Sequence, residues 1–218
     1  MKPLVSIIMG STSDLPVMEK ACKLLDEMQV PFEVNALSAH RTPDAVEHFA
    51  ATAKERGIKV IIAGAGMAAA LPGVIAASTT LPVIGVPIKG MLDGLDAMLS
   101  IIQMPPGIPV ATVGVNGAQN AAILAVEMLA IADEELAQRM AVYKGNLKIK
   151  IEKANEELAQ IKYQFKTNST IRLCIKDVNH LRLVSAISAS EALILYVSSR
   201  WVLLIPTIPM VVWLRQSG

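Results

Sequence analysis

Short runs of apolar residues recur along the first part of the chain, and most are followed by a segment with apolar residues at helical spacing. Most of the runs are nearly continuous in apolar residues, which is typical of parallel strands buried on both faces. Such a strand–helix alternation predicts an α/β fold with one parallel sheet, helices on both faces and right-handed crossovers. The predicted strands cover residues 4–9, 32–37, 59–63, 82–86 and 109–113.

The segments between the predicted strands carry helix signals. In the first segment, Met18, Ala21 and Leu25 fall on one helical face. Gly57 follows the second segment at a position where helices commonly end. The predicted helices cover residues 15–28, 45–56, 71–78, 92–102 and 119–131.

A longer helix is predicted over residues 133–166, where a narrow apolar stripe runs through charged sequence. A helix with one narrow stripe packs either across its own domain or on a neighbouring subunit, and the pattern does not separate the two. The stripe consists of Leu136, Met140, Tyr143, Leu147, Ile151, Ala154, Leu158 and Ile161.

Length and composition limit the classes of function that the chain can have. The 218 residues suffice for one compact domain and an appendage, and the 53% hydrophobic content favours a large core or subunit interfaces. A net charge of +1 gives no electrostatic reason to expect a nucleic-acid partner. The first residues resemble a strand more than a secretory leader, so a cytoplasmic location is expected.

The composition changes over residues 169–218, which are apolar and hold both tryptophans. Residues 192–214 are nearly long enough to cross a bilayer, but Arg200 lies near their middle and Pro206 and Pro209 interrupt them. An arginine at that depth costs about 2.5–3.5 kcal/mol on insertion scales. A poorly ordered or loosely helical appendage is therefore expected, with a membrane anchor or a packing element as less favoured alternatives.

Ligands of open parallel sheets bind beyond the carboxyl ends of the strands, so the residues after each predicted strand are candidates. MGSTSD, residues 9–14, follows the first strand. Ser11 and Ser13 offer hydroxyls beside free amides at a helix start, which suits a phosphate. Asp14 suits sugar hydroxyls, which donate hydrogen bonds to a carboxylate. The alternative is that Ser13 or Asp14 simply caps the helix.

SAHRTP, residues 38–43, follows the second strand. Arg41 can bind a phosphate through two hydrogen bonds, and Ser38 or Thr42 can satisfy backbone amides. His40 is the candidate proton carrier, because an imidazole can both give and take a proton near neutral pH. The alternative for His40 is a hydrogen-bonded structural imidazole.

AGAGMAAALPG, residues 63–73, follows the third strand and contains no titratable side chain. Its small residues let a ligand approach the backbone closely and leave amides bare for a planar or small neutral molecule. The alternative is a tightly packed turn.

Several sequence motifs are missing. The chain has no His/Cys pattern with metal-ligand spacing, no GxGxxG motif after the first strand, no P-loop and no nucleophile elbow. The candidates that remain are one histidine, one arginine, several hydroxyls and one aspartate. They predict proton transfer on a phosphorylated sugar derivative without a metal or redox cofactor.

The chain resembles one known family through several motifs taken together. GSTSD, SAHRTP, AGAGMAAALPG, LPVIGVP and QNAAILA occur in the order and spacing of class I PurE proteins, the N5-carboxyaminoimidazole ribonucleotide mutases of purine biosynthesis. The resemblance covers about residues 3–168 and does not reach the extension. It implies a three-layer αβα, flavodoxin-like fold and a homo-octamer whose active sites are shared between neighbouring subunits.

The resemblance also implies an isomerase that moves a carboxylate from N5 to C4 of an aminoimidazole ribonucleotide and needs no cofactor. His40 matches the catalytic histidine of the family. The substrate-binding residues expected on this basis are Ser11, Ser13, Asp14, Ser38, Arg41, Gly66, Ala70 and Leu71.

One departure concerns AAALPG, where many family members read AAHLPG, so Ala70 replaces a second histidine. A lower rate or affinity is expected if that histidine positions substrate. Two alternatives stay open: carboxylation of aminoimidazole ribonucleotide by free carbon dioxide, and a nucleotide-binding module with impaired catalysis.

Overall fold

The computed structural model describes residues 2–167, 193–197, 200–204 and 212–214, and the chain divides into two compact units, Met1–Tyr163 and Gln164–Gly218. The first unit contains a five-stranded parallel sheet in the order β2-β1-β3-β4-β5. This is the strand order of flavodoxin-like folds, as the sequence analysis expected. The strands are β1 (Val5–Met9), β2 (Phe32–Ala36), β3 (Val60–Gly66), β4 (Val83–Ile88) and β5 (Ala111–Thr112).

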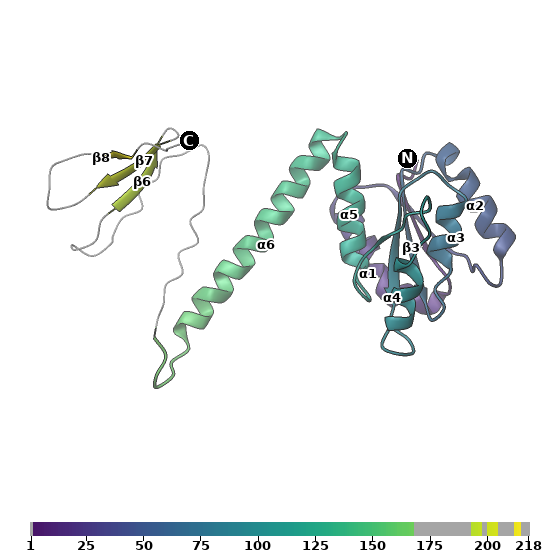
Figure 1. The fold of residues 1–218 in the computed structure, drawn as a ribbon, viewed down its shortest axis with the longest axis horizontal. Coiled ribbons are helices and arrows are strands. Elements are labelled where there is room, and N and C mark those ends of the chain that lie inside the picture. Colours follow the sequence, from purple (N-terminus) through teal and green to yellow (C-terminus); the bar gives the residue numbers. More distant parts are fainter. Residues whose placement is uncertain (1, 168–192, 198–199, 205–211, 215–218) are drawn as a thin grey trace. The chain divides into compact units, whose positions relative to one another are not determined.

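Helices cover both faces of this sheet, which confirms the three-layer architecture (Figure 1). Side chains of one strand alternate between the faces: Ile7 packs on the first face and Ile8 on the second, and Ile62 and Ile61 do the same in β3. The first face is covered by α1 (Leu15–Glu27) and α5 (Ala118–Ala130), and the second by α2 (Pro43–Arg56), α3 (Leu71–Ala77) and α4 (Leu95–Ile102).

The central strand β1 brings the candidate loops together. It pairs with β2 on one side and with β3 on the other, so that Met9 lies opposite both Ala36 and Gly64. The chain therefore leaves β1 for one neighbour and returns to the other. This reversal of strand order leaves a crevice beyond the carboxyl ends of the strands, where ligands of such sheets bind.

The helix α4 begins three residues later than the sequence predicts. Leu92, Asp93 and Gly94 all have left-handed backbone conformations, with φ of 48°, 54° and 89°. A helix cannot continue through such residues, and only Gly94 adopts this conformation without steric strain. The predicted start at residue 92 was therefore wrong for a backbone reason that the apolar pattern does not reveal.

The long helix α6 (Glu134–Gln160) starts at Asp133, whose carboxylate accepts the N–H of Leu136 at 2.9 Å. Leu136 and Met140 are buried against the α1 and α5 layer. Further along the stripe, Leu147 and Ile151 are 43% and 60% exposed. The first turns thus pack on the helix's own domain, whereas Leu147 and Ile151 are exposed.

The second unit contains a small antiparallel sheet in the order β6-β7-β8. Strands here were not expected, because the sequence analysis favoured a poorly ordered or loosely helical segment. The remaining residues of 168–218 lie outside the described part, and the expectation for them stays a prediction. No helix within the described segments has the length and apolar character to span a bilayer. The three strands are β6 (Leu193–Val197), β7 (Arg200–Leu204) and β8 (Val212–Leu214).

Candidate active site

The loop after β1 forms a short 3-10 turn, Thr12–Asp14, that leads into α1. Ser11 caps this turn: its Oγ accepts the N–H of Ser13 at 3.3 Å and the hydroxyl of Ser13 at 2.9 Å. Asp14 precedes α1 but makes no side-chain capping bond. Ser11 therefore caps the 3-10 turn, whereas α1 has no side-chain cap, so the alternative of capping by Ser13 or Asp14 is not what the structure shows. The Asp14 carboxylate is not used by an amide of α1.

The carboxyl of Asp14 is half-buried at the carboxyl edge of the sheet. Burial raises its pKa above the ordinary value, because the charged form loses hydration. Hydrogen bonds with the Ser11 backbone and the Ser13 side chain, and the positive charge of Arg41, oppose this rise. An incompletely solvated carboxylate of this kind is a good acceptor for hydroxyl groups of a sugar.

The loop after β2 continues directly from the sheet. The N–H of Leu37 donates to the carbonyl of Met9 at 2.9 Å, next to the last paired residues of β1 and β2. Ser38 then begins a tight loop that ends at Thr42, where α2 starts. His40 lies between them with an exposed side chain, as a proton carrier that must meet a ligand requires.

Arg41 joins the two loops. Its Nη2 donates to the carbonyl of Gly10 at 2.7 Å, and its Nε donates to Ser38 Oγ at 3.3 Å. Its charge also acts on the Asp14 carboxyl. Within the described residues Nη1 makes no further hydrogen bond, so it can receive an anion. The guanidinium is thus held at the carboxyl edge, beside the serines and the aspartate.

The loop after β3 supplies the other expected binding residues. Ala70 is half-buried directly before α3, and Leu71 is only 3% exposed in the core on the second face. The side chain of Leu71 therefore packs in the core, and a ligand could meet this residue through its backbone. A Cβ at Gly66 would lie 3.4 Å from the carbonyl oxygen of Ile88, which is an ordinary contact distance, so strand packing alone does not require a glycine here.

The structure brings Ser11, Ser13, Asp14, Ser38 and Arg41 together through the contacts of the first two loops. The third loop adjoins them through strand pairing, because the N–H of Gly10 donates to the carbonyl of Gly64 at 3.3 Å.

A further cation lies at the same edge and was not predicted from the sequence. Lys89 comes directly after β4; its N–H donates to Asn116 Oδ1 at 2.9 Å, and its ammonium pairs with Asp93 at 2.9 Å. Its place after a buried strand was a signal that could have drawn attention to it.

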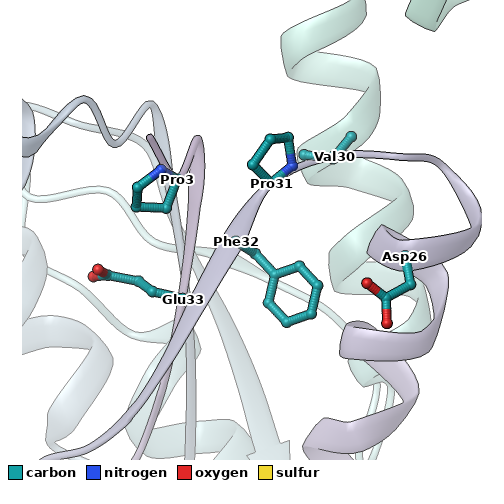
Figure 2. A pocket seen from close by; sticks show the side chains of 6 residues that line it. All are labelled: Pro3, Asp26, Val30, Pro31, Phe32 and Glu33. Carbon is teal, nitrogen blue, oxygen red and sulfur yellow. The ribbon is translucent and has the colours of Figure 1, made fainter. Parts of the chain in front are cut away.

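A surface hollow lies at the opposite, amino-terminal edge of the sheet (Figure 2). Its charged members are Asp26 and Glu33, and Glu33 is already engaged by the Ser6 hydroxyl and by Arg56. Two carboxylates would repel a phosphate, so this hollow does not suit a phosphorylated ligand. It is lined by Pro3, Asp26, Val30, Pro31, Phe32 and Glu33.

Metal-binding side chains do not gather in the described segments, where no group of three or more His, Cys, Asp or Glu residues could hold an ion. The loops after β1 and β2 offer hydrogen-bond donors, the carboxylate of Asp14 and the imidazole of His40. This set suits the binding of a phosphorylated sugar derivative and the transfer of a proton.

Fold and site together define a flavodoxin-like α/β protein with a candidate site for a phosphorylated ligand. The family model described as AIR carboxylase matches residues 4–150. The chain belongs to this family.

Individual relatives give the same picture. An N5-carboxyaminoimidazole ribonucleotide mutase of Pyrococcus abyssi is 59% identical over 147 residues, which are 67% of this chain and 84% of that protein. The protein of that name from Bacillus subtilis is 55% identical over 161 residues, covering 72% of this chain and 99% of its own. The crystal structure of Treponema denticola PurE superposes with a TM-score of 0.65 at 30% identity, covering 72% of this chain and 98% of that chain.

Proposed function

We propose that this protein is an isomerase of purine biosynthesis that converts N5-carboxyaminoimidazole ribonucleotide to 4-carboxy-5-aminoimidazole ribonucleotide. The observation that carries the proposal is the contact between Arg41 and Gly10, which holds an anion-binding guanidinium and the neighbouring His40 at the edge where Asp14 lies. The 59% identical mutase of Pyrococcus abyssi supports the same reaction.

Substrate binding follows from the chemistry of the two loops. The guanidinium of Arg41 and the hydroxyls of Ser11 and Ser13 bind the 5′-phosphate, because several donors converge there. Asp14 accepts hydrogen bonds from the ribose hydroxyls. The glycine-rich loop after β3 lies beside the aminoimidazole ring, where its small residues leave space.

His40 carries one proton through the reaction. As an acid it protonates N5 while the bond between N5 and the carboxylate carbon breaks, which releases carbon dioxide and leaves the amine. C4 of the electron-rich ring then attacks the carbon dioxide and forms a carbon–carbon bond. His40, now a base, removes the hydrogen from C4 and restores the aromatic ring. The imidazole ends in its starting protonation state, so no second acid or base is required.

Retention of carbon dioxide is the second requirement. In this proposal, the segment over residues 64–73, which has no charged side chain, holds the carbon dioxide beside the ring. Two reactants held in contact reach effective concentrations far above those in solution. Recombination at C4 can therefore compete with escape.

The proposal also includes assembly of several subunits, which would cover the exposed site. His40 and Arg41 are exposed in a single chain, whereas carbon dioxide must be kept in and water out. Met67, Met91 and Leu92, from the loops after β3 and β4, are 63%, 69% and 74% exposed and could meet another subunit. A homo-octamer is proposed, together with a cytoplasmic location. Light scattering of the purified protein tests the octamer.

The proposal has two competitors. The family description names a carboxylase, so carboxylation of aminoimidazole ribonucleotide by free carbon dioxide is the second candidate. Replacement of the common family histidine by Ala70 favours a third, a module that binds the nucleotide without catalysis.

One assay separates the three. Purified protein is mixed with either N5-carboxyaminoimidazole ribonucleotide or aminoimidazole ribonucleotide, and the ultraviolet absorbance is followed with and without added bicarbonate. Turnover without bicarbonate is expected for the mutase. Turnover of aminoimidazole ribonucleotide only with bicarbonate would establish the carboxylase, and binding without turnover the module. A chelator is expected to leave the rate unchanged, because the proposed proton transfer uses side chains alone.

A further inference from the structure

Thr42 occupies the last position before α2, where a threonine commonly accepts a hydrogen bond from an amide of the first helical turn. Its side chain makes no such bond. Instead, Oγ1 accepts the N–H of Ser38 at 3.0 Å and donates to the carbonyl of Ser38 at 3.1 Å. The Thr42 N–H donates to the same carbonyl at 2.8 Å. The hydroxyl is thus directed back across the loop and away from the helix.

These three hydrogen bonds close the loop over residues 38–42, with His40 and Arg41 inside it. Ser38 in turn contacts Arg41, because its Oγ accepts the backbone N–H and the Nε–H of Arg41, both at 3.3 Å. Arg41 then reaches Gly10 in the neighbouring loop. A chain of contacts therefore runs from Thr42 through Ser38 to the guanidinium at the carboxyl edge of the sheet.

We propose that Thr42 is a positioning residue that holds His40 and Arg41 in place for substrate. This inference rests on the proposed mutase function. Thr42 acts through Ser38 and has no chemical step of its own. Its hydroxyl bonds lie at the surface, where water can replace a lost partner, so they add little to global stability. The reaction rate depends far more strongly on these bonds if they place the reacting groups, since a misplacement of about 1 Å can lower the rate a hundredfold.

The substitution Thr42→Val tests this role because it keeps the shape of the side chain and removes the hydroxyl. Both kcat and KM depend on the loop, through His40 and Arg41 respectively. We expect KM to rise and kcat to fall, each by about tenfold or more. Thr42→Ser restores the hydroxyl and is expected to keep both constants within about threefold of the unmodified protein.

Thr52→Val is the matched control. Thr52 lies on the same helix, where its hydroxyl donates to the carbonyl of His48 at 2.8 Å and accepts from Arg56. This variant loses the same group and some helix stability, but it leaves the loop intact. Its KM is expected to be unchanged. A merely structural threonine would lower the folded fraction, and with it the apparent kcat, without changing KM.

Three results would overturn the inference: an unchanged KM in Thr42→Val, an equal rise of KM in Thr52→Val, or no rescue by Thr42→Ser. Calorimetric titration with aminoimidazole ribonucleotide separates this inference from the proposed function. If the unmodified protein shows no turnover, the function fails, yet Thr42→Val is still expected to bind this nucleotide about tenfold more weakly than Thr42→Ser. Equal affinities, or no binding by any variant, would refute the positioning role.

Discussion

The guanidinium of Arg41 donates to the carbonyl oxygen of Gly10 across 2.7 Å, although the two residues are 31 positions apart in sequence. Gly10 follows β1 and Arg41 follows β2, so this hydrogen bond fastens two loops that adjacent strands deliver to one edge. It also fixes the cation before a ligand arrives. Binding then costs less side-chain entropy than it would with a freely moving arginine.

Arg41→Lys is expected to raise KM by about tenfold to a hundredfold, with a smaller effect on kcat. A lysine ammonium cannot contact Gly10 and Ser38 together while presenting a planar pair of donors to a phosphate. Loss of a charged hydrogen bond of about 1.5–3 kcal/mol accounts for this range. Steady-state kinetics measures it, with Arg139→Lys as control, because Arg139 contacts the Met28 carbonyl away from the site. Equal KM values in the two variants would contradict the role of Arg41.

His40→Asn is expected to lower kcat by about a hundredfold or more, the usual contribution of a general acid–base. The imidazole is exposed in the single chain, so the fold should persist, with a change in unfolding free energy within about 0.5 kcal/mol. The oligomer should persist too, because the apolar residues proposed to meet another subunit are unchanged. Single-turnover kinetics and light scattering check the two halves of this prediction. His48→Asn, on the exposed side of α2, is the matched control. Substantial turnover in His40→Asn would remove the proposed proton carrier.

Ala70→His introduces the histidine that many family members carry at this position. Ala70 is half-buried directly before α3, at the edge that faces the ligand. One added hydrogen bond to substrate, worth about 1 kcal/mol, corresponds to an increase in kcat/KM of about fivefold. Kinetics of the variant beside the unmodified protein measures the effect. A lower kcat/KM would mean that the loop has adapted to the smaller residue.

Asp14→Asn is expected to weaken binding and to change the pH dependence of stability. Burial raises the pKa of the Asp14 carboxyl, so its contribution to stability is complete below the ordinary value of 3.8 and is lost as pH rises through the raised value. At neutral pH the ionised, half-buried group is a cost. The asparagine variant should then be slightly more stable, by less than about 1 kcal/mol because water screens the group.

Urea unfolding of both proteins between roughly pH 3 and pH 7 tests this dependence. The stability difference in favour of the variant should grow as pH rises. A difference that instead favoured the aspartate increasingly at higher pH would show that the charge of Arg41 outweighs the burial of Asp14.

Truncation after Asn168 is expected to leave an active oligomer. The compact first unit ends at Tyr163, and the matching family region ends at residue 150. All site residues discussed above lie within that region. Light scattering and the substrate assay of the shortened chain test the prediction. Insolubility or dissociation would assign the extension a structural role.

Sequence reasoning predicted the sheet well because burial on both faces leaves a plain signature. Ile7 and Ile8 are consecutive and apolar, and each packs against a different helix layer. The start of α4 was predicted wrongly because Leu92 and Asp93 adopt left-handed backbone conformations. Among these three residues, only Gly94 is of a type that favours this conformation. The strands of the extension were missed because its apolar residues also fit a helix.

The site was predictable to the level of loops. Residues after neighbouring parallel strands must meet at one edge, so the proximity of the MGSTSD and SAHRTP segments followed from their order. The hydrogen-bond partner of Arg41 could not be predicted, because it is the backbone carbonyl of Gly10, and every residue type has such a carbonyl. The direction of the Thr42 hydroxyl could not be predicted either, because a threonine directly before a helix usually caps that helix.

The diverted hydroxyl of Thr42 bears on any attempt to make this protein more robust. A survey of helix starts would single out α2, whose first turn has no side-chain cap, and would suggest Thr42→Asp as a stabilising change. The new carboxylate would turn toward the helix amides and release Ser38. Heat tolerance would then improve while turnover declined, so thermostability engineering should leave this position untouched.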